Sequence, residues 1–184
     1  DETIGDKPIN RLENIYSKRS VQTDFQNSNE VVDQNTTAMT IESHGKTKIP
    51  QEIIKSAIYL AREAQNINQL KLSVEKFDGC ALKKTATNLV FFKGEPEAQL
   101  MFVGEAPGAH EDRKGIPFVG PSGLLLDKMI KSIGINHSNV MVSNTVFWRP
   151  PGNRTPTLEE TSICRPFLER LIEIVEPKVL VALG

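Results

Sequence analysis

QLMFVGEAPG, residues 99–108, joins an apolar run to a loop of small and rigid residues. Two more apolar runs follow, NVMVSN at 139–144 and KVLVALG at 178–184. Continuous apolar runs of this length are typical of strands that are buried on both faces of a parallel sheet. We therefore predict three strands, at 99–104, 139–144 and 178–184, the last of them central in its sheet.

Segments with helical spacing separate the predicted strands. They are PSGLLLDKMIKSIGI (121–135) and TPTLEETSICRPFLERLIEIVEP (155–177), whose threonine and acidic opening is typical of a helix N-terminus. Upstream, residues 49–72 predict an amphipathic helix, and residues 72–79 predict a shorter one that breaks at Gly79. The order β-α-β-α-β predicts an α/β fold of three layers, αβα, around a central parallel sheet.

The first part of the chain differs in composition from the rest. Residues 1–48 are rich in polar side chains and lack sustained periodicity, so we predict a disordered N-terminal extension. Residues 49–184 then form the α/β domain. Because the chain starts without Met and stops at the third predicted strand, we expect an incomplete domain whose last strand and helix are missing.

Composition narrows the class of protein. The 184 residues are 39% hydrophobic and 24% charged, with a net charge of −1, which fits a globular protein without a strongly basic nucleic-acid arm. No run approaches the 18 or so apolar residues of a membrane span. Two distant cysteines, Cys80 and Cys164, offer no disulfide framework and suit a reducing compartment, so we expect a cytoplasmic protein.

The loops after the first two predicted strands hold the candidate site, because ligands of open α/β sheets bind at the carboxyl ends of the strands. Glu105 follows the first strand directly and is placed either to orient a water or act as a base, or to cap a helix or pair with an arginine. Phe118, between two tight turns, is either a plug over the core or a stacking platform for a planar ligand.

Two further features lie on the same rim. Asn144 ends the second strand, where its amide either satisfies a turn or matches the N3–H and O4 edge of a pyrimidine. Ser122 and Gly123 open a helix whose amides suit a phosphate. RPPGNR presents Arg149, Asn153 and Arg154, which suit phosphate contact. Together these signals predict a pocket for a base flanked by phosphate.

Three segments in this order resemble the uracil-DNA glycosylase superfamily, with family 4 as the nearest branch. They are GEAPGAHEDRKGIPFVGPSG (104–123), SNTVFWRPPGNRTPT (143–157) and CRPFLERLIEIVEPKVLVALG (164–184). The resemblance begins near FDGCALKKTATNLVFFKG (77–94) and runs to the last residue. It implies hydrolysis of the N-glycosidic bond of uracil in DNA, which leaves an abasic site for base excision repair.

The resemblance also implies roles for individual residues. Glu105 would orient the attacking water, and Asn153 would lie near the base and the DNA backbone as a second catalytic residue. Four residues would bind the uracil, with Glu111 crowding C5 against thymine, Phe118 stacking on the flipped base and Asn144 reading its edge: Gly104, Glu111, Phe118 and Asn144. Phosphate contacts would come from Ser122, Gly123, Arg149 and Arg154.

The chain departs from family 4 at the [4Fe–4S] cluster, which the resemblance implies on four cysteines. Phe77 and Trp148 stand at two of the ligand positions, and Cys80 and Cys164 remain at the other two. We predict that the cluster is absent, that the two aromatic rings fill its volume, and that the cysteines are buried thiols.

A second departure concerns the histidine of a His-Pro-Ser-like motif, which the resemblance places beyond the third strand and which none of His44, His110 and His137 matches. We therefore expect the catalytic activity of this chain alone to be weak or absent.

The leading hypothesis is a monomeric uracil-DNA glycosylase that acts on single- or double-stranded DNA and does not bind membranes. The alternative is an inactive nucleic-acid-binding module that keeps the base pocket, attached to a polymerase or repair complex. A dinucleotide-binding protein is disfavoured, because GEAPG is not GxGxxG.

Overall fold

The computed structural model describes residues 51–184. The predicted extension at residues 1–48 lies outside these residues, so both the extension and its boundary stay predictions.

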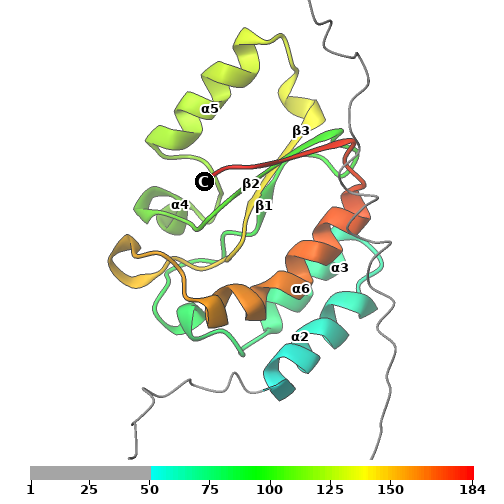
Figure 1. Ribbon diagram of the computed structural model, residues 1–184, viewed down its shortest axis with the longest axis vertical. Coiled ribbons are helices and arrows are strands. Elements are labelled where there is room, and N and C mark those ends of the chain that lie inside the picture. The colour runs from blue at the N-terminus through cyan, green and yellow to red at the C-terminus, as the bar shows by residue number, and fades with distance from the viewer. Residues whose placement is uncertain (1–50) are drawn as a thin grey trace, which may run out of the picture. The chain divides into compact units, whose positions relative to one another are not determined.

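The centre of the described part is a four-stranded sheet (Figure 1). Its strands are β1 (Phe92–Lys93), β2 (Leu100–Gly104), β3 (Val140–Asn144) and β4 (Val179–Ala182), in the order β1-β3-β2-β4. β2 pairs in parallel with both β3 and β4. The three strands predicted from the apolar runs are thus confirmed.

Strand β1 makes the sheet mixed, because it pairs antiparallel with β3 through Phe92↔Ser143 and Lys93↔Val142. The sequence analysis missed this strand, since two residues are too few to show an alternating pattern.

Strand β4 differs from the expected burial. Val179 is 53% exposed and Leu180 48% exposed, and the strand has a single neighbour, β2, within the described residues. Within the described residues β4 is therefore an edge strand, and its central position in a larger sheet stays a prediction.

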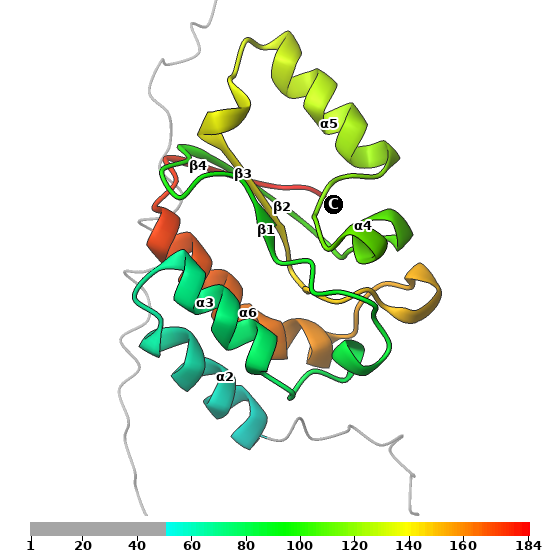
Figure 2. The same cartoon turned by 180° about the vertical axis from the view of Figure 1, so that it is seen from behind.

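Helices cover both faces of the sheet, which confirms the three-layer αβα fold (Figures 1 and 2). One face carries α2 (Gln51–Glu63), α3 (Ile67–Lys76) and the long α6 (Leu158–Val175). α5 (Pro121–Ser132) covers the other face, and the short α4 (Ala109–Lys114) lies in the connection from β2 to α5. Short 3₁₀ turns occupy Ala81–Lys84, His137–Asn139 and Pro151–Asn153.

The boundary between the first two helices was predicted wrongly. α2 stops at Glu63, and α3 begins at Ile67 rather than near residue 72. Asn66 is the reason, because its side-chain oxygen accepts a 3.0 Å hydrogen bond from the Gln69 amide and caps α3. The Thr157 cap predicted for α6 is confirmed, with Glu160 completing a capping box.

Two apolar clusters hold the layers together. The larger one joins α2, α3 and α6 to the sheet and includes Leu70, Met101, Phe147, Phe167 and Leu171. The smaller one lies under α5 and consists of Phe102, Leu126, Ile130, Val140 and Val142, with Phe118 packed against it.

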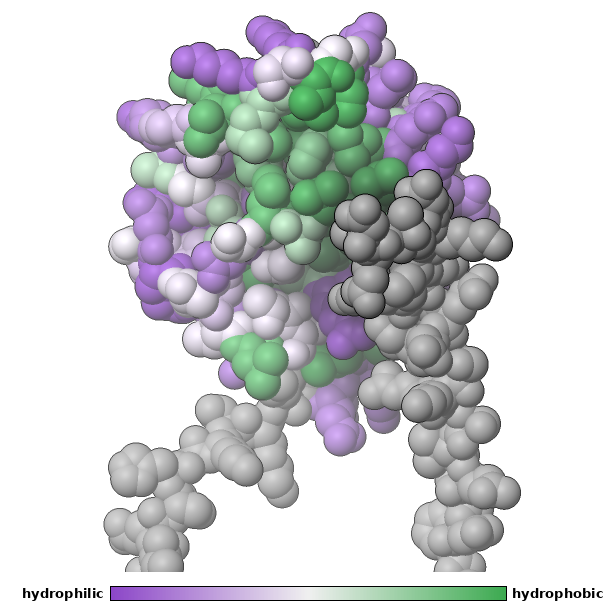
Figure 3. All heavy atoms as spheres, turned by 45° about the horizontal axis from the view of Figure 1, so that its top comes forward, coloured by the Kyte–Doolittle hydropathy of each residue, from purple (hydrophilic) through white to green (hydrophobic). Residues whose placement is uncertain are grey.

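Helix α5 is apolar on its outer side as well. Three large apolar side chains of the helix and that of its C-cap residue are 57–66% exposed: Leu124, Leu125, Met129 and Ile133. Figure 3, with the end of the domain that carries α5 turned forward, shows apolar side chains gathered there.

The same substitution at two positions of α6 tests this packing. Leu171 is fully buried, whereas Leu158 is 80% exposed. We expect Leu171→Ala to lower the free energy of unfolding by about 2–5 kcal/mol, because it removes buried methyl groups and leaves a cavity. Leu158→Ala serves as the control and should change it by less than about 0.5 kcal/mol. Urea unfolding followed by circular dichroism measures both, and equal effects would contradict this packing of α6.

Candidate functional site

The carboxyl ends of β2 and β3 bring two predicted site residues side by side. Gly104 and Asn144 are the last partners in the parallel register of these strands. Thr145 links the segments that follow the two strands. Its amide donates a hydrogen bond to the Gly104 carbonyl (2.9 Å), and its hydroxyl donates one to the Glu105 carbonyl (2.6 Å). The backbone of Glu105 is therefore held at the end of the sheet.

A cavity of about 170 Å³ opens next to this pair of strand ends. Its lining comes from the loop after β2, from α4, from the turn before α5, from α5 itself and from β3: Ala106, Gly108, Glu111, Phe118, Ser122 and Asn144. The structure thus brings together four residues that the sequence analysis proposed for one pocket, namely Glu111, Phe118, Ser122 and Asn144.

Gly104 lies against the side chains of Asn144 and Phe118, which line the pocket. A Cβ atom built on it would lie 2.6 Å from Oδ1 of Asn144 and 2.7 Å from Cζ of Phe118. Such distances are too short for non-bonded atoms, so the ring and the amide keep their places only over a glycine. Gly104 shapes the pocket through its lack of a side chain.

Asn144 is the buried polar group that faces the pocket. The residue is 3% exposed, and its side-chain amide makes no hydrogen bond to any residue in the range 51–184. Among the described residues no side-chain polar atom is both cut off from solvent and without a partner, so the Asn144 amide reaches solvent through the pocket. The amide is therefore open to a ligand, and it satisfies no turn within residues 51–184.

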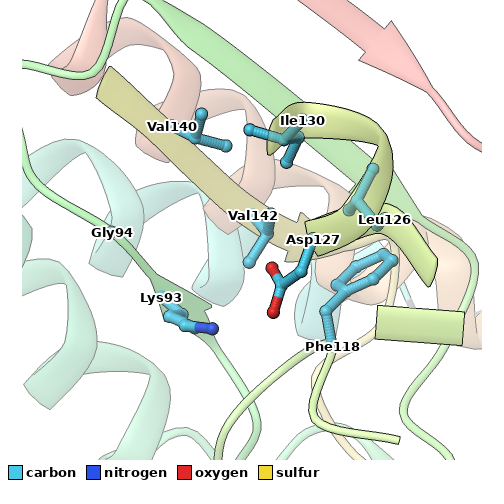
Figure 4. Close-up of a pocket in the computed structure, with 8 residues that line it drawn as sticks. All are labelled: Lys93, Gly94, Phe118, Leu126, Asp127, Ile130, Val140 and Val142. Carbon is cyan, nitrogen blue, oxygen red and sulfur yellow. The ribbon is translucent and has the colours of Figure 1, made fainter. Parts of the chain in front are cut away.

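Phe118 belongs to both the core and the pocket. Its ring packs against the cluster under α5, and it also lines a second cavity of about 50 Å³ with Leu126 and Val142 (Figure 4). Phe118 also lines the pocket that contains Asn144. The ring that packs over the core is thus also present in the pocket. The two alternatives for Phe118, a plug over the core and a stacking platform for a ligand, do not exclude each other.

The backbone of Phe118 is unusual, with φ at 54°. Few residues other than glycine adopt this left-handed conformation. Gly123 accommodates it, because a Cβ at this position would collide with the carbonyl group of Phe118. Gly123 and Ser122 belong to the first turn of α5, whose amides have no partner within the helix.

Glu111 is buried, at 8% exposure, and both of its carboxylate oxygens accept hydrogen bonds from the loop. Oε1 accepts from the amides of Val119 (3.0 Å) and Gly120 (2.6 Å), and Oε2 accepts from the amide of Gly108 (3.2 Å). Its neighbour Asp112, also buried, accepts from the amides of Thr87 (2.8 Å) and Asn88 (3.2 Å).

Glu105, in contrast, is exposed, and its carboxylate has no hydrogen bond or ion pair with the described residues. The alternative that it caps a helix or pairs with an arginine is therefore wrong for residues 51–184. Its carboxylate is available to a water or a ligand.

Three other predicted residues lie outside the pocket lining, in the segment after β3. Asn153 is exposed, with φ at 56°, and its Oδ1 accepts a 2.7 Å hydrogen bond from Nε of Arg149. Arg154 makes two hydrogen bonds to the Glu160 carboxylate, of 2.9 and 2.6 Å. The roles of these residues at the base and the phosphates stay predictions.

The ion pair between Arg154 and Glu160 changes the pKa of both side chains. Hydrogen bonds from Arg154, with a smaller contribution from the Thr157 amide, lower the pKa of the Glu160 carboxyl against the opposing effect of burial. The same hydrogen bonds raise the pKa of Arg154. This pair fixes the start of α6 to the segment that presents Asn153.

Cys80 and Cys164 meet in the larger core cluster, where both are fully buried. The hydrogen bond between the two thiols and their burial raise the pKa of Cys164 well above its ordinary value. Phe77 and Trp148 lie in the same cluster, 4% and 2% exposed, and their replacement of an iron–sulfur cluster stays a prediction.

A [4Fe–4S] cluster requires four thiolates or equivalent ligands. Within residues 51–184 no group of three or more His, Cys, Asp or Glu side chains is placed to hold a metal ion. The donors present, two thiols beside two aromatic rings, do not fit such a cluster.

Several site features were missed by the sequence analysis. Gly108 and Ala106 line the pocket, Thr145 fastens the strand ends, and Asp112 anchors α4. The Glu-Asp pair at 111–112 followed by Gly115, with Gly108 before it, could have signalled a short capped helix.

The architecture and the pocket agree with the comparison to known families. The model of the uracil DNA glycosylase superfamily matches residues 91–184, which contain all four strands of the sheet and every residue that lines the pocket. This chain belongs to the uracil DNA glycosylase superfamily. The predicted resemblance is thus confirmed.

Among curated relatives, the chain is 45% identical over 120 residues to the type-4 uracil-DNA glycosylase of Sulfurisphaera tokodaii, covering 65% of this chain and 54% of that protein. It is 46% identical over 111 residues to the type-4 enzyme of Thermotoga maritima, covering 60% and 58%. The enzyme of Archaeoglobus fulgidus is 49% identical over 105 residues, covering 57% and 53%. The matches span about half the length of these relatives.

Over residues 51–184, no helix combines the length and apolarity needed to cross a membrane.

The Arg154–Glu160 pair predicts a pH dependence of stability. Because the pKa of Glu160 is lower in the folded than in the unfolded protein, its charge stabilises the fold above the unfolded value of about 4.3 and ceases to do so as the pH falls through the folded pKa. We expect Glu160→Gln to lower the free energy of unfolding by at most about 1 kcal/mol at pH 7, because solvent screens this partly exposed pair, and by progressively less at acidic pH. Urea unfolding at pH 7, 5 and 3.5 measures the difference, and a constant difference would contradict this origin.

Proposed function

We propose that the cavity lined by Glu111, Phe118 and Asn144 is the base pocket of a DNA-repair glycosylase. This enzyme would hydrolyse the N-glycosidic bond of uracil in DNA and leave an abasic site. The observation that carries the proposal is the Asn144 amide, which lines the pocket without a hydrogen-bond partner among residues 51–184. The names of the relatives support the same substrate.

The proposed recognition uses the complementary edges of amide and base. The Asn144 side chain offers one acceptor, for N3–H of uracil, and donors, for O4. Cytosine presents an acceptor at N3 and a donor at position 4, so an Asn144 amide held in the orientation that fits uracil would be mispaired with it. The base must leave the duplex stack to reach the pocket, and stacking on Phe118 offsets part of that cost. Glu111 lies beside C5 in this arrangement, where it would crowd the methyl group of thymine.

The proposed chemistry takes place at the mouth of the pocket. A water forms the new bond to C1′ of the sugar as the C1′–N1 bond breaks, the uracil leaves as an anion with the electron pair, and the Glu105 carboxylate takes the proton that the water loses. The sugar is cationic in the transition state, so the exposed carboxylate of Glu105 would both orient the water and stabilise the positive charge. Asn153 would assist near the base and the backbone.

Contacts with DNA phosphates complete the proposal. Ser122 and Gly123 would donate the unpaired amides of the first turn of α5, and Arg149 and Arg154 would supply positive charge on the neighbouring loop. We propose further that the protein acts as a cytoplasmic monomer on single- or double-stranded DNA.

One substitution tests the pocket. We expect Asn144→Asp to weaken binding of a uracil-containing single-stranded oligonucleotide about 10- to 100-fold, because the donor to O4 is replaced by a charged acceptor. Asn139→Asp, at an exposed position, is the matched control and should bind like the unchanged chain. Fluorescence anisotropy at fixed salt concentration, with a cytosine oligonucleotide of the same sequence for comparison, measures the effect.

The same samples distinguish the possible functions. Alkali-labile sites that form at uracil, and not at cytosine, would support hydrolysis by the protein. The protein at its natural full length is assayed in the same way. If it too binds the uracil oligonucleotide preferentially without cleaving it, the enzymatic part of the proposal is contradicted and a base-binding module is favoured. Equal affinity for the two oligonucleotides would contradict the pocket itself.

The proposal includes the absence of an iron–sulfur cluster. Cys80 and Cys164 are the two cysteines of the chain, and Phe77 and Trp148 are buried in the same core cluster. We expect purified protein to contain no stoichiometric iron or acid-labile sulfide and to lack a visible absorption band. Four iron atoms per chain after anaerobic purification would contradict the expectation.

A further inference from the structure

The carboxylate of Glu111 joins two ends of one loop. It accepts a hydrogen bond from Gly108, which caps α4, and from Gly120, which caps α5. A Cβ built on either glycine would lie 2.9 Å from a carboxylate oxygen of Glu111. The loop backbone therefore closes directly around this side chain, and a Cβ at either position would displace the carboxylate.

The third hydrogen bond fixes the peptide group that follows Phe118. The N–H of this group, which belongs to Val119, donates to Oε1 of Glu111 over 3.0 Å. Its carbonyl group, which belongs to Phe118, lies against the Cα of Gly123. Both ends of one peptide plane are thus held, and the orientation of this plane sets the ψ angle of Phe118.

This restraint acts on a residue that does not adopt its conformation readily. Phe118 has φ at 54°, a conformation that typically costs a non-glycine residue on the order of 1 kcal/mol or more and persists only where the surroundings enforce it. The enforced backbone determines where the ring projects, between the core under α5 and the pocket with Asn144.

We propose that Glu111 is a positioning residue that holds the Phe118 ring in place to stack on the base, through the peptide group between Phe118 and Val119. This inference rests on the proposed function. It adds to the contact with C5, because it assigns to the carboxylate a role that does not require it to touch the substrate. Three of its roughly four acceptor sites are already occupied by loop amides.

A double-variant experiment tests this route of action. Glu111→Gln keeps the shape but replaces one acceptor with a donor, so at least one amide loses its partner. We expect this variant and Phe118→Leu each to weaken binding of the uracil oligonucleotide about tenfold. The double variant should also be weakened about tenfold, because both changes remove the same stacking contact. A hundredfold loss in the double variant would overturn the proposal.

An independent readout follows the backbone itself. In ¹H–¹⁵N spectra, the amide signals of Val119 and Gly120 should move in Glu111→Gln, as their hydrogen bonds change, and should stay in place in Glu97→Gln, an exposed control. Unmoved signals in Glu111→Gln would overturn the proposal. Urea unfolding of each variant verifies that the chain is folded at the temperature of the measurement.

The outcomes separate this inference from the proposed function. If the unchanged chain binds uracil and cytosine oligonucleotides equally, the proposed function fails, while the amide signals still report on the loop. If the unchanged chain prefers uracil and Phe118→Leu loses affinity, but Glu111→Gln binds normally, the positioning role fails and the proposed function stands.

Discussion

The parallel register between β2 and β3 is the constraint on which the site depends. It sets Gly104 opposite Asn144 at the carboxyl ends of the strands, where the apolar interior of the sheet gives way to loops. Because Gly104 has no side chain, the amide of Asn144 and the ring of Phe118 can approach each other over it. A shift of this register by one residue would turn Asn144 toward the opposite face of the sheet and separate the two.

Much of this arrangement could be predicted from the sequence. Apolar runs identified β2, β3 and β4, and helical spacing identified α5 and α6, because buried strands and amphipathic helices leave patterns over many residues. The position of Asn144 directly after an apolar run, and of Phe118 between tight turns, was enough to place both at the same edge. β1 and α4 are too short to leave such a pattern, and the end of α2 depends on one cap at Asn66.

The partners of charged residues were harder to predict. Glu111 and Asp112 are adjacent, but their carboxylates turn to amides on opposite sides of α4, at residues 108, 119 and 120 in one case and 87 and 88 in the other. Backbone amides carry no sequence identity, so nothing in the residue pattern marks them as partners. Arg154 illustrates the same limit, because its pairing with Glu160 depends on how the loop enters α6.

The difference between the two glutamates beside the pocket has a further consequence. The groups that would hold a base are preorganised, whereas the carboxylate of Glu105 extends from a fixed backbone into solvent and has several rotamers open to it. In the proposed reaction, the entropy of that side chain is lost when the substrate arrives. Selection of the base and assembly of the reacting geometry then become successive events, the first governed by a rigid cavity and the second by the ordering of one flexible side chain.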